Sequence, residues 1–574
     1  MEAILLQDLG LIILAGTFLA FIFKRFKQPL IVAYIFAGLL IGPLGLGVIT
    51  DHANIAVLAE LGVAFLLFAL GMEIDFSRLW QFKRPILLGG LSQIVVTVSI
   101  VTVLTNFLGL ALIESVYLGF MMAFSSTVIV VKILSKRKQL NSLEGKLIIG
   151  YVLVQDLVAV LALPLLANPA AISNAGLFFN IIASLGAILV LAFLLNRFVF
   201  GRLIRYAAKS PEIFYLTILS SFFFFTALSV YLNFSIPVGA FIGGLALTRG
   251  SFSLEAVSTI QYVRDLFATV FFVSLGMQLT LLPFEAPLLI FAVMLGVVFI
   301  LNPIIFGLVN LSAGFGLRAA TFIGLALAQS SEFSFILASQ GFVLGQITEP
   351  IYNLAIWTII ISMIATPYMI NRADKFYGFF HKYFPRARIL FFERRLIELE
   401  KLPKDKEELE NHIVVAGAGV FGSALATQLK SAGTVVVVDQ DPEIVQHFIQ
   451  KGFTAIYASR NNHEVWERVR LNKAKLLVLT VPENATAIQI LKAAKKANPK
   501  IMVFARAHYY RDALGLYNNG ADYVVMPQII GSNYALKEIK EFLETGKHPR
   551  AKLLHEEFLK ILEEKAKEEE KSDF

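Results

Sequence analysis

Long apolar segments occupy most of the first 371 residues of this chain. A helix needs about 20 mainly apolar residues to cross the hydrocarbon core of a bilayer. Thirteen segments fit that requirement, although the ninth is short. We expect spanning helices at about residues 4–23, 29–47, 54–72, 84–108, 111–134, 145–167, 175–200, 211–232, 235–248, 258–280, 287–313, 318–344 and 350–371. The sequence therefore predicts a polytopic α-helical membrane domain.

Composition divides the chain into a membrane part and a soluble part. The whole chain is 57% hydrophobic and 16% charged, whereas soluble proteins average about 45–50% and about 25%. Residues 1–371 hold only 18 of the 50 Lys and Arg residues, and residues 372–574 hold the other 32. The absence of cysteine excludes disulfides and thiolate-bound metals. We predict a membrane domain at 1–371, a charged linker at 372–410, a soluble domain at 411–545 and a charged tail at 546–574.

Basic residues between the predicted helices are confined to one side of the membrane. Loops after odd-numbered helices hold all of them: Lys24, Arg25, Lys27, Arg78, Lys83, Arg84, Lys136, Arg137, Lys138, Lys146, Arg202, Arg205, Lys209 and Arg249. Loops that are rich in Lys and Arg are cytoplasmic in most membrane proteins. The pattern predicts an external N-terminus and a cytoplasmic C-terminal domain. Because the positive charge is explained by topology, we do not expect a nucleic-acid partner.

Three short motifs recur at nearly the same spacing. Leu70-Gly71-Met72 recurs as Leu275-Gly276-Met277, and Ser125-Ser126-Thr127 recurs as Ser330-Ser331-Glu332, both 205 residues later. Ala37-Gly38-Leu39 matches Gly243-Gly244-Leu245 at 206. The repeat relates helices 1–6 to helices 8–13, a shift of seven, so the second copy is inverted in the membrane. Inverted repeats with a central binding site are typical of secondary transporters.

Few charged residues lie within the apolar segments. The clearest are Glu60, Lys132, Asp156, Asp265 and Glu332, with Arg264 near a helix start. Such residues are costly in hydrocarbon unless they face protein or water. Asp156 lies in the middle of its segment and has no cation within four residues. Burial disfavours an isolated carboxylate, so a proton and a metal cation can compete for it. This competition is sufficient to couple opposite fluxes of the two ions.

The repeated polar patches predict breaks in two helices. Ser125, Ser126 and Thr127 lie in helix 5, and Gln329 to Glu332 lie in helix 12. Broken helices place exposed carbonyls and helix termini near the middle of a membrane. We predict a transport site near Asp156, where Lys132 and Glu332 compensate helix ends or each other. Its candidate residues are Ser125, Ser126, Thr127, Lys132, Gln155, Asp156, Ser330, Ser331 and Glu332.

The soluble part begins with a strand, a glycine-rich turn and a helix. Gly417, Gly419 and Gly422 form G-x-G-x-x-G, and Asp439 ends the next predicted strand. This arrangement favours a Rossmann-like domain that places a phosphate at the helix N-terminus and a ribose beside the acid. We expect an adenine nucleotide, namely AMP, ATP or NAD(H). The candidate binding residues are Gly417, Ala418, Gly419, Val420, Phe421, Gly422, Asp439, Gln440, Ala458, Ser459 and Thr480.

Over about residues 1–545 the chain resembles Kef-type members of the monovalent cation:proton antiporter-2 superfamily. The resemblance rests on Gln155-Asp156, the FFVSLGM run at 271–277, the two predicted breaks and the C-terminal domain, which resembles a KTN (regulator of potassium conductance) module. It implies thirteen helices, a six-helix core moving against a dimerisation scaffold, and potassium/proton exchange at Asp156. It also implies a homodimer in the inner membrane, nucleotide control and an ancillary regulatory subunit.

Two positions differ from glutathione-gated relatives. The chain has Ala458-Ser459 where these relatives usually have Gly-Asp, and its basic run after the fifth strand is reduced to Arg506 and His508. The sequence therefore leaves glutathione control open.

We expect an electroneutral transporter and not an enzyme. The residue before Asp156 is Gln155, whose amide cannot titrate, so one proton would exchange for one cation. Sodium remains an alternative to potassium, because both bind oxygen ligands. A nucleotide-gated potassium channel would need a carbonyl-lined filter, and the nearest string is Gly314-Phe315-Gly316. An NAD-dependent membrane oxidoreductase would need a substrate domain that the sequence does not contain.

Overall fold

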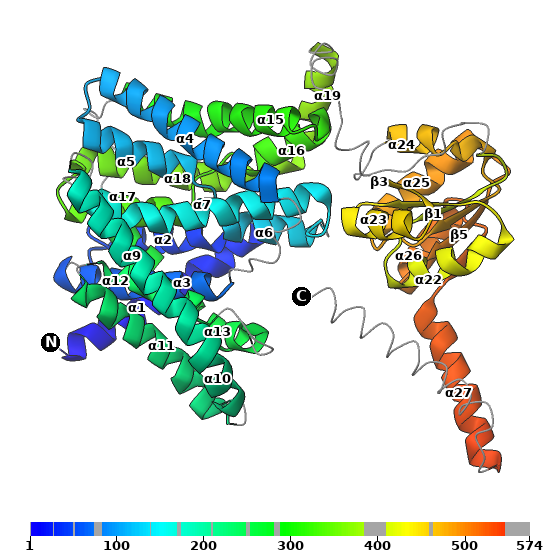
Figure 1. The fold of residues 1–574 in the computed structure, drawn as a ribbon, viewed down its shortest axis with the longest axis horizontal. Coiled ribbons are helices and arrows are strands. Elements are labelled where there is room, and N and C mark those ends of the chain that lie inside the picture. The colour runs from blue at the N-terminus through cyan, green and yellow to red at the C-terminus, as the bar shows by residue number, and fades with distance from the viewer. Residues whose placement is uncertain are drawn as a thin grey trace. The chain divides into compact units, whose positions relative to one another are not determined.

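The computed structural model describes residues 2–26, 28–49, 52–73, 83–137, 139–168, 174–207, 210–232, 234–247, 253–279, 288–383, 409–457 and 463–545. It divides into two compact units, a helical unit that contains α1 to α19 and an α/β unit that contains β1 to α27 (Figure 1). The predicted tail, most of the predicted linker, and Ala458 and Ser459 lie outside the described residues.

Each of the thirteen predicted segments contains helix in the structure. The helices are α1 (Glu2–Arg25), α2 (Leu30–Ile41), α3 (His52–Glu73), α4 (Lys83–Phe107), α5 (Leu112–Ala123), α6 (Thr127–Lys136), α7 (Leu143–Ala167), α9 (Ala175–Leu195), α10 (Gly201–Ala207), α11 (Pro211–Tyr231), α12 (Ile236–Leu245), α13 (Ser253–Met277), α14 (Leu288–Gly296), α15 (Asn302–Ser312), α16 (Gly316–Ala326), α17 (Glu332–Val343), α18 (Glu349–Asn371) and α19 (Ala373–Tyr383). Among the described residues, eight helical runs are long and apolar enough to cross a membrane.

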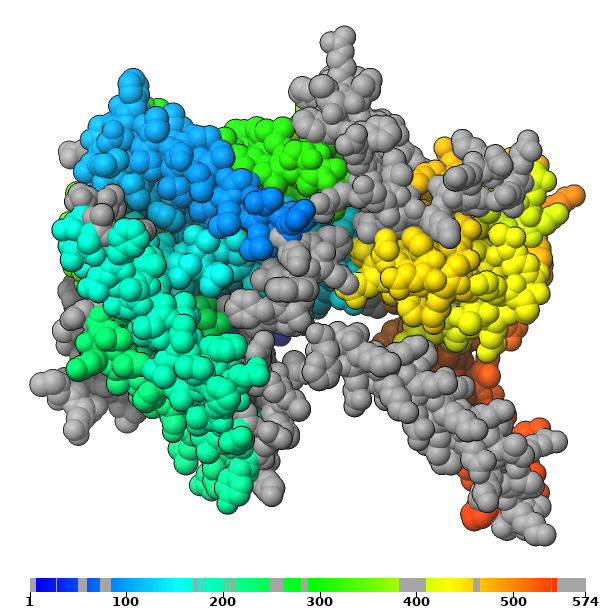
Figure 2. Space-filling view, in the orientation of Figure 1, coloured from blue at the N-terminus to red at the C-terminus, as the bar shows by residue number. Residues whose placement is uncertain are grey.

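Apolar side chains cover the outside of the helical unit. Figure 2 shows one face of this unit, where α4 and α9 to α11 form much of the visible surface. Large apolar side chains are exposed on these helices, including Leu88 and Phe107 on α4 and Tyr231 on α11. Exposed apolar surface on this scale is unusual for a soluble protein and is expected of helices that face lipid.

Two of the predicted membrane segments are broken where their polar patches lie. The first break separates α5 from α6 over residues 124–126, and the second separates α16 from α17 over residues 327–331. Phe124, Ser126 and Ser331 have extended backbone dihedral angles. The predicted breaks are therefore confirmed. Two other segments contain a π-helical turn, at Asn196–Phe200 (η2) and Val297–Leu301 (η3).

Paired glycines show the inverted repeat in space. Gly38 of α2 lies against Gly276 of α13, so closely that a Cβ on Gly38 would be 2.0 Å from the Val273 carbonyl oxygen. In the same way Gly71 of α3 lies against Gly244 of α12. The repeat offset of 205 to 206 residues relates Gly38 to Gly244 and Gly71 to Gly276, so it converts one glycine pair into the other. Small residues at such crossings let helix backbones approach in membranes.

The helix that follows the last spanning segment packs back on the helical unit. Arg318 of α16 forms an ion pair with Asp374 of α19, with 2.8 Å between Nη2 and Oδ1. The Arg318 guanidinium also lies 5.6 Å from the centre of the Tyr377 ring. The start of the predicted linker is therefore helical, and this helix is attached to one half of a broken helix.

The second unit is a six-stranded parallel sheet with helices on both faces (Figure 1). Its strands run in the order β3-β2-β1-β4-β5-β6. They are β1 (Ile413–Ala416), β2 (Val435–Asp439), β3 (Thr454–Tyr457), β4 (Leu476–Leu479), β5 (Met502–Arg506) and β6 (Tyr523–Val525), and the helices are α22 (Val420–Leu429), α23 (Pro442–Gln450), α24 (His463–Arg468), α25 (Asn484–Ala497), α26 (Tyr510–Asn518) and α27 (Pro527–Thr545). The strand order reverses between β1 and β4, which is the position where such folds bind ligands.

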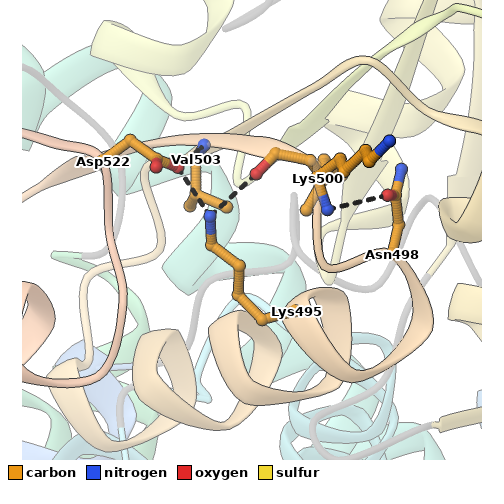
Figure 3. A network of polar contacts seen from close by, with 6 residues as sticks. Lys495, Asn498, Lys500, Val503 and Asp522 are labelled. Carbon is orange, nitrogen blue, oxygen red and sulfur yellow. Dashed lines mark hydrogen bonds and ion pairs between the residues drawn. The ribbon is translucent and has the colours of Figure 1, made fainter.

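A polar network fixes the edge of this sheet. Lys495 of α25 donates to the Ile501 carbonyl and to Asp522 Oδ2, each at 2.8 Å (Figure 3). The same Asp522 oxygen accepts the Val503 amide at 2.7 Å (Figure 3). One lysine and one aspartate therefore join α25, the start of β5 and the turn before β6.

Candidate functional site

Asp156 lies beside the N-terminus of the half-helix α6. It is carried by α7, and only 2% of its surface is exposed. Its Oδ2 accepts a hydrogen bond of 2.7 Å from the hydroxyl of Thr127, the first residue of α6. A helix N-terminus carries a partial positive charge, so this end of α6 stabilises the ionised carboxylate. The sequence prediction that Asp156 lies beside the break in helix 5 is confirmed.

Gln155 bridges the break itself. Its Oε1 accepts the Ser125 amide at 3.0 Å, and its Nε2 donates to the Ala123 carbonyl at 3.0 Å. Nε2 also donates to Gln93 Oε1 of α4 at 2.8 Å. The residue next to Asp156 therefore holds both chain ends at the interruption.

The two broken helices touch through their extended segments. Ser125 Oγ donates to the Leu327 carbonyl at 3.0 Å, and Gln329 Nε2 donates to the Ser126 carbonyl at 3.3 Å. These side chains are fully buried. The crossing therefore satisfies backbone groups that neither helix can satisfy alone, as the interior of a membrane requires.

The second break places another carboxyl group at a half-helix N-terminus. Ser331 caps α17 by accepting the Phe333 amide, and Ser330 N donates to Ser362 Oγ of α18, both at 3.0 Å. Glu332 is the first residue of α17 and is 1% exposed. Both half-helix N-termini at the crossing thus have a buried acid beside them.

The glycine-rich turn of the second unit has the geometry that its motif predicts. Gly417 has a φ of +91°, which favours glycine, and a Cβ on Gly422 would lie 2.0 Å from the Gly417 carbonyl oxygen. Thr480, just after β4, donates its hydroxyl to that same oxygen. Val420 is exposed at the start of α22. The helix N-terminus is therefore open to a ligand, as phosphate binding requires.

Asp439 ends β2 and organises this turn. Its Oδ2 accepts the Ala418 amide at 2.5 Å, and its Oδ1 accepts the Asp441 amide at 2.8 Å. Burial raises the pKa of Asp439, while the two backbone hydrogen bonds act in the opposite direction. Gln440 follows at the edge of the turn and is partly buried. The acid is placed where a ribose is bound in related folds.

Comparison with known proteins identifies both units. Residues 10–372 match the family model "Sodium/hydrogen exchanger, transmembrane", and residues 413–527 match the model "TrkA-N domain". The chain belongs to the sodium/hydrogen exchanger family. This exchanger is therefore a multi-pass membrane cation/proton antiporter that carries a TrkA-N domain of the nucleotide-binding, regulatory type.

Relatives match the exchanger over both units. It is 31% identical over 555 residues to the putative cation/proton antiporter YbaL of Escherichia coli, covering 93% of this chain and 97% of the relative. It is 28% identical to the glutathione-regulated potassium-efflux system protein KefC of Salmonella schwarzengrund, covering 94% of this chain and 86% of the relative. The sodium proton antiporter MjNhaP1 of Methanocaldococcus jannaschii has the same membrane fold, with 18% identity and a TM-score of 0.53, over 66% of this chain and all of that chain.

The structure of the exchanger separates the predicted site residues. Those at the two breaks and on α7 are gathered at the crossing: Ser125, Ser126, Thr127, Gln155, Asp156, Ser330, Ser331 and Glu332. Lys132 differs, because its side chain is exposed on α6. Glu60 is exposed on α3, and Asp265 forms an ion pair with Arg264 at 2.9 Å. The sequence could not show which of these residues face the buried crossing and which lie on the exposed surface of their helices.

The buried polar residues at the crossing that were not predicted include Gln93 and Thr97 of α4 and Asn302 of α15, all fully buried. Thr97 Oγ1 donates to Asn302 Oδ1 at 3.0 Å. These two positions are 205 residues apart, which is the repeat offset, so the spacing could have pointed to them.

Proposed function

We propose that the exchanger moves one monovalent cation, potassium, against one proton, with Asp156 holding the two ions alternately. The observation that carries this proposal is the position of Asp156, buried at the N-terminus of α6 and beside the crossing. A buried carboxylate favours a bound proton or a bound cation over an empty, charged state. Thr127 and the extended segments supply oxygen atoms, which are the ligands that alkali cations prefer.

Electroneutral exchange is supported by the neighbours of Asp156. Gln155 is an amide and cannot titrate, and its side chain is already committed to Ser125, Ala123 and Gln93. Lys132, the cation nearest in sequence to the break, is exposed on α6. If Asp156 is the one carboxylate that titrates during the cycle, both loaded forms of the site carry the same charge and the cycle moves no net charge.

Potassium is preferred because the relative KefC, 28% identical over nearly the whole chain, is named a potassium-efflux system protein. Sodium is the competing substrate, since the fold is shared with a sodium proton antiporter. The proposed exchanger works as a homodimer in the inner membrane, with its N-terminus outside and its TrkA-N domain in the cytoplasm.

Regulation is proposed to occur through an adenine nucleotide, namely AMP, ATP or NAD(H), on the TrkA-N domain. The open N-terminus of α22 would hold a phosphate group, and Asp439 would accept a ribose hydroxyl. Gln440 and Thr480 flank this turn.

Flux in proteoliposomes tests the proposed function. Wild-type protein and Asp156→Asn are reconstituted at equal density with an internal pH dye, and a potassium or sodium gradient is applied. We expect cation-driven pH changes with the wild type, larger for potassium, and none with Asp156→Asn. Normal flux in the variant would remove Asp156 from the mechanism, and equal or larger sodium flux would replace potassium as the substrate.

A further inference from the structure

The last carbonyl groups of half-helix α5 are capped by side chains from four other helices. A helix C-terminus leaves its final carbonyls without backbone partners. Here the Met121 carbonyl accepts Ser334 Oγ at 2.6 Å, and the Met122 carbonyl accepts Asn302 Nδ2 at 2.7 Å. The Ala123 carbonyl accepts two amides, Gln93 Nε2 at 3.1 Å and Gln155 Nε2 at 3.0 Å.

Gln93, Gln155 and Asn302 are also joined in one chain of hydrogen bonds, in which Thr97 connects Gln93 to Asn302. Gln155 Nε2 donates to Gln93 Oε1 at 2.8 Å, and Gln93 Nε2 donates to Thr97 Oγ1 at 3.2 Å. The Thr97 hydroxyl in turn donates to Asn302 Oδ1 at 3.0 Å. We call Gln93, Thr97, Gln155 and Asn302 the amide cap. Each of the three side-chain amide nitrogens donates to an oxygen, so the orientation of all three amides is fixed by the network.

The amide cap joins the two inverted repeats. Thr97 and Asn302 are repeat-related positions, so their hydrogen bond links the two copies at equivalent points. Asn302 directly follows the π-helical turn Val297–Leu301, whereas α4 is α-helical through Thr97. π-turns are often found at functional sites. The extra residue in this turn changes which face of α15 carries Asn302.

We propose that Gln93, Thr97 and Asn302 are positioning residues for cation exchange. They hold the end of α5 and the side chain of Gln155, and through Gln155 they fix the loop that places Thr127 against Asp156. This inference rests on the proposed role of Asp156. It extends that role, because the cap itself does not touch the cation.

The chemistry of the cap also restricts where a cation binds. A carbonyl oxygen that accepts an amide directs its lone pair at that amide and is a poorer cation ligand. The Ala123 carbonyl accepts two amides, so both of its lone pairs are engaged and the cation is directed to the Asp156 side of the break. The amide N–H donors of the cap stabilise the partial negative charge at the C-terminus of α5. They add no titrating group, because amides are uncharged.

Isosteric variants in the full-length protein test the inference. Thr97→Val removes the central hydroxyl, and Asn302→Leu removes the donor to Met122. The matched control is Thr105→Val, since Thr105 is a buried threonine of α4 whose hydroxyl donates to the Val101 carbonyl of its own helix. We expect the potassium KM to rise about tenfold in Thr97→Val and Asn302→Leu, with a smaller change in maximal rate, and no change in Thr105→Val.

A second variant separates positioning from packing. Gln93→Glu keeps the shape of the side chain, but its carboxylate cannot donate to Ala123 or Thr97. Its protonated form regains one donor. We therefore expect the ratio of the Gln93→Glu KM to the wild-type KM at the same pH to approach one at acid pH and to rise as the carboxyl ionises, a profile that a packing defect would not produce.

The outcomes are distinct. If Asp156→Asn still exchanges ions, the proposed function fails and this inference fails with it. If Asp156→Asn is inactive while Thr97→Val shifts KM no more than Thr105→Val, only the inference is overturned. A ratio of the Gln93→Glu KM to the wild-type KM that does not change with pH would also overturn it.

Discussion

Gly71 of α3 and Gly244 of α12 lie backbone against backbone. A Cβ on Gly71 would be 2.2 Å from the Phe241 carbonyl oxygen, and one on Gly244 would be 2.1 Å from the Phe68 carbonyl oxygen. Neither carbonyl can move without shifting its helix. The approach of α3 and α12 therefore depends on the absence of a methyl group at both positions.

We predict that Gly71→Ala and Gly244→Ala each destabilise the exchanger by ~1–3 kcal/mol, the usual cost of overpacking. Gly186→Ala is the control, because a Cβ on Gly186 meets nothing within 4 Å. Thermal unfolding in detergent, followed by size-exclusion fluorescence, measures the difference. Equal midpoints for Gly244→Ala and Gly186→Ala would contradict the close approach.

A second prediction concerns net charge movement. Lys132 is exposed on α6, so Lys132→Gln should leave the exchange rate within about twofold, the scale on which surface changes act. Solid-supported-membrane recordings should show no transport current in the wild type or in this variant, while dye-measured proton flux continues. A current that follows proton flux and disappears in Lys132→Gln would identify Lys132 as a second titrating group.

The third prediction concerns the TrkA-N domain. Removing the carboxylate in Asp439→Ala should weaken binding of AMP, ATP or NAD(H) by about tenfold or more, because a hydrogen bond to a charged group contributes ~1.5–3 kcal/mol. Since burial raises the pKa of Asp439, wild-type affinity should also fall as the pH is lowered through that raised pKa. Calorimetry on the full chain measures both effects.

Asp522→Asn provides the control for that experiment. Asp522 belongs to the same sheet but lies at the β5–β6 edge, where it bonds Lys495. Its loss should lower domain stability without changing nucleotide affinity. If Asp522→Asn weakens binding as much as Asp439→Ala, the effect is general destabilisation and the ribose assignment is wrong.

The fourth prediction follows from a buried histidine at the start of β1. Burial lowers the pKa of His412 below 6.5, although its hydrogen bond of 2.8 Å with the Val469 carbonyl acts in the other direction. The unfolded chain therefore binds a proton first as the pH falls. The stability that the neutral ring contributes is present above pH 6.5 and is lost between pH 6.5 and the lowered folded value.

We expect His412→Gln to reduce this loss, because an amide can still donate to the Val469 carbonyl and does not titrate. Differential scanning calorimetry of the full chain at about pH 7.5 and about pH 5.5, on either side of the histidine range, measures the fall in the domain transition. An equal fall in wild type and variant would show that other groups dominate.

Much of the fold could be predicted from sequence patterns that lie within a single helix. Apolar length located the membrane segments, and repeated polar patches located the breaks beside Ser125 and Ser330. Asp156 was found because a carboxylate in an apolar helix has few structural explanations. The glycine spacing and Asp439 located the turn between β1 and α22.

The amide cap and the face of Lys132 could not be obtained in this way. An amide or hydroxyl in a membrane helix commonly bonds its own backbone, so nothing within their own helices distinguished Gln93 and Asn302 from ordinary packing. Their partners are the carbonyls of α5, whose position depends on where a different helix ends. The exposure of Lys132 depends on the rotation of α6 about its own axis, which periodicity does not fix in a uniformly apolar segment.

The contact between Arg318 and Asp374 has a practical consequence for truncated proteins. The match to the exchanger family ends at residue 372, and the last spanning helix ends at Asn371. A protein cut there would lose both the ion-pair partner and the aromatic ring that Arg318 packs against. A fragment meant to transport ions without its TrkA-N domain should therefore extend through Tyr383, because the half-helix α16 keeps its native surroundings only when α19 is included.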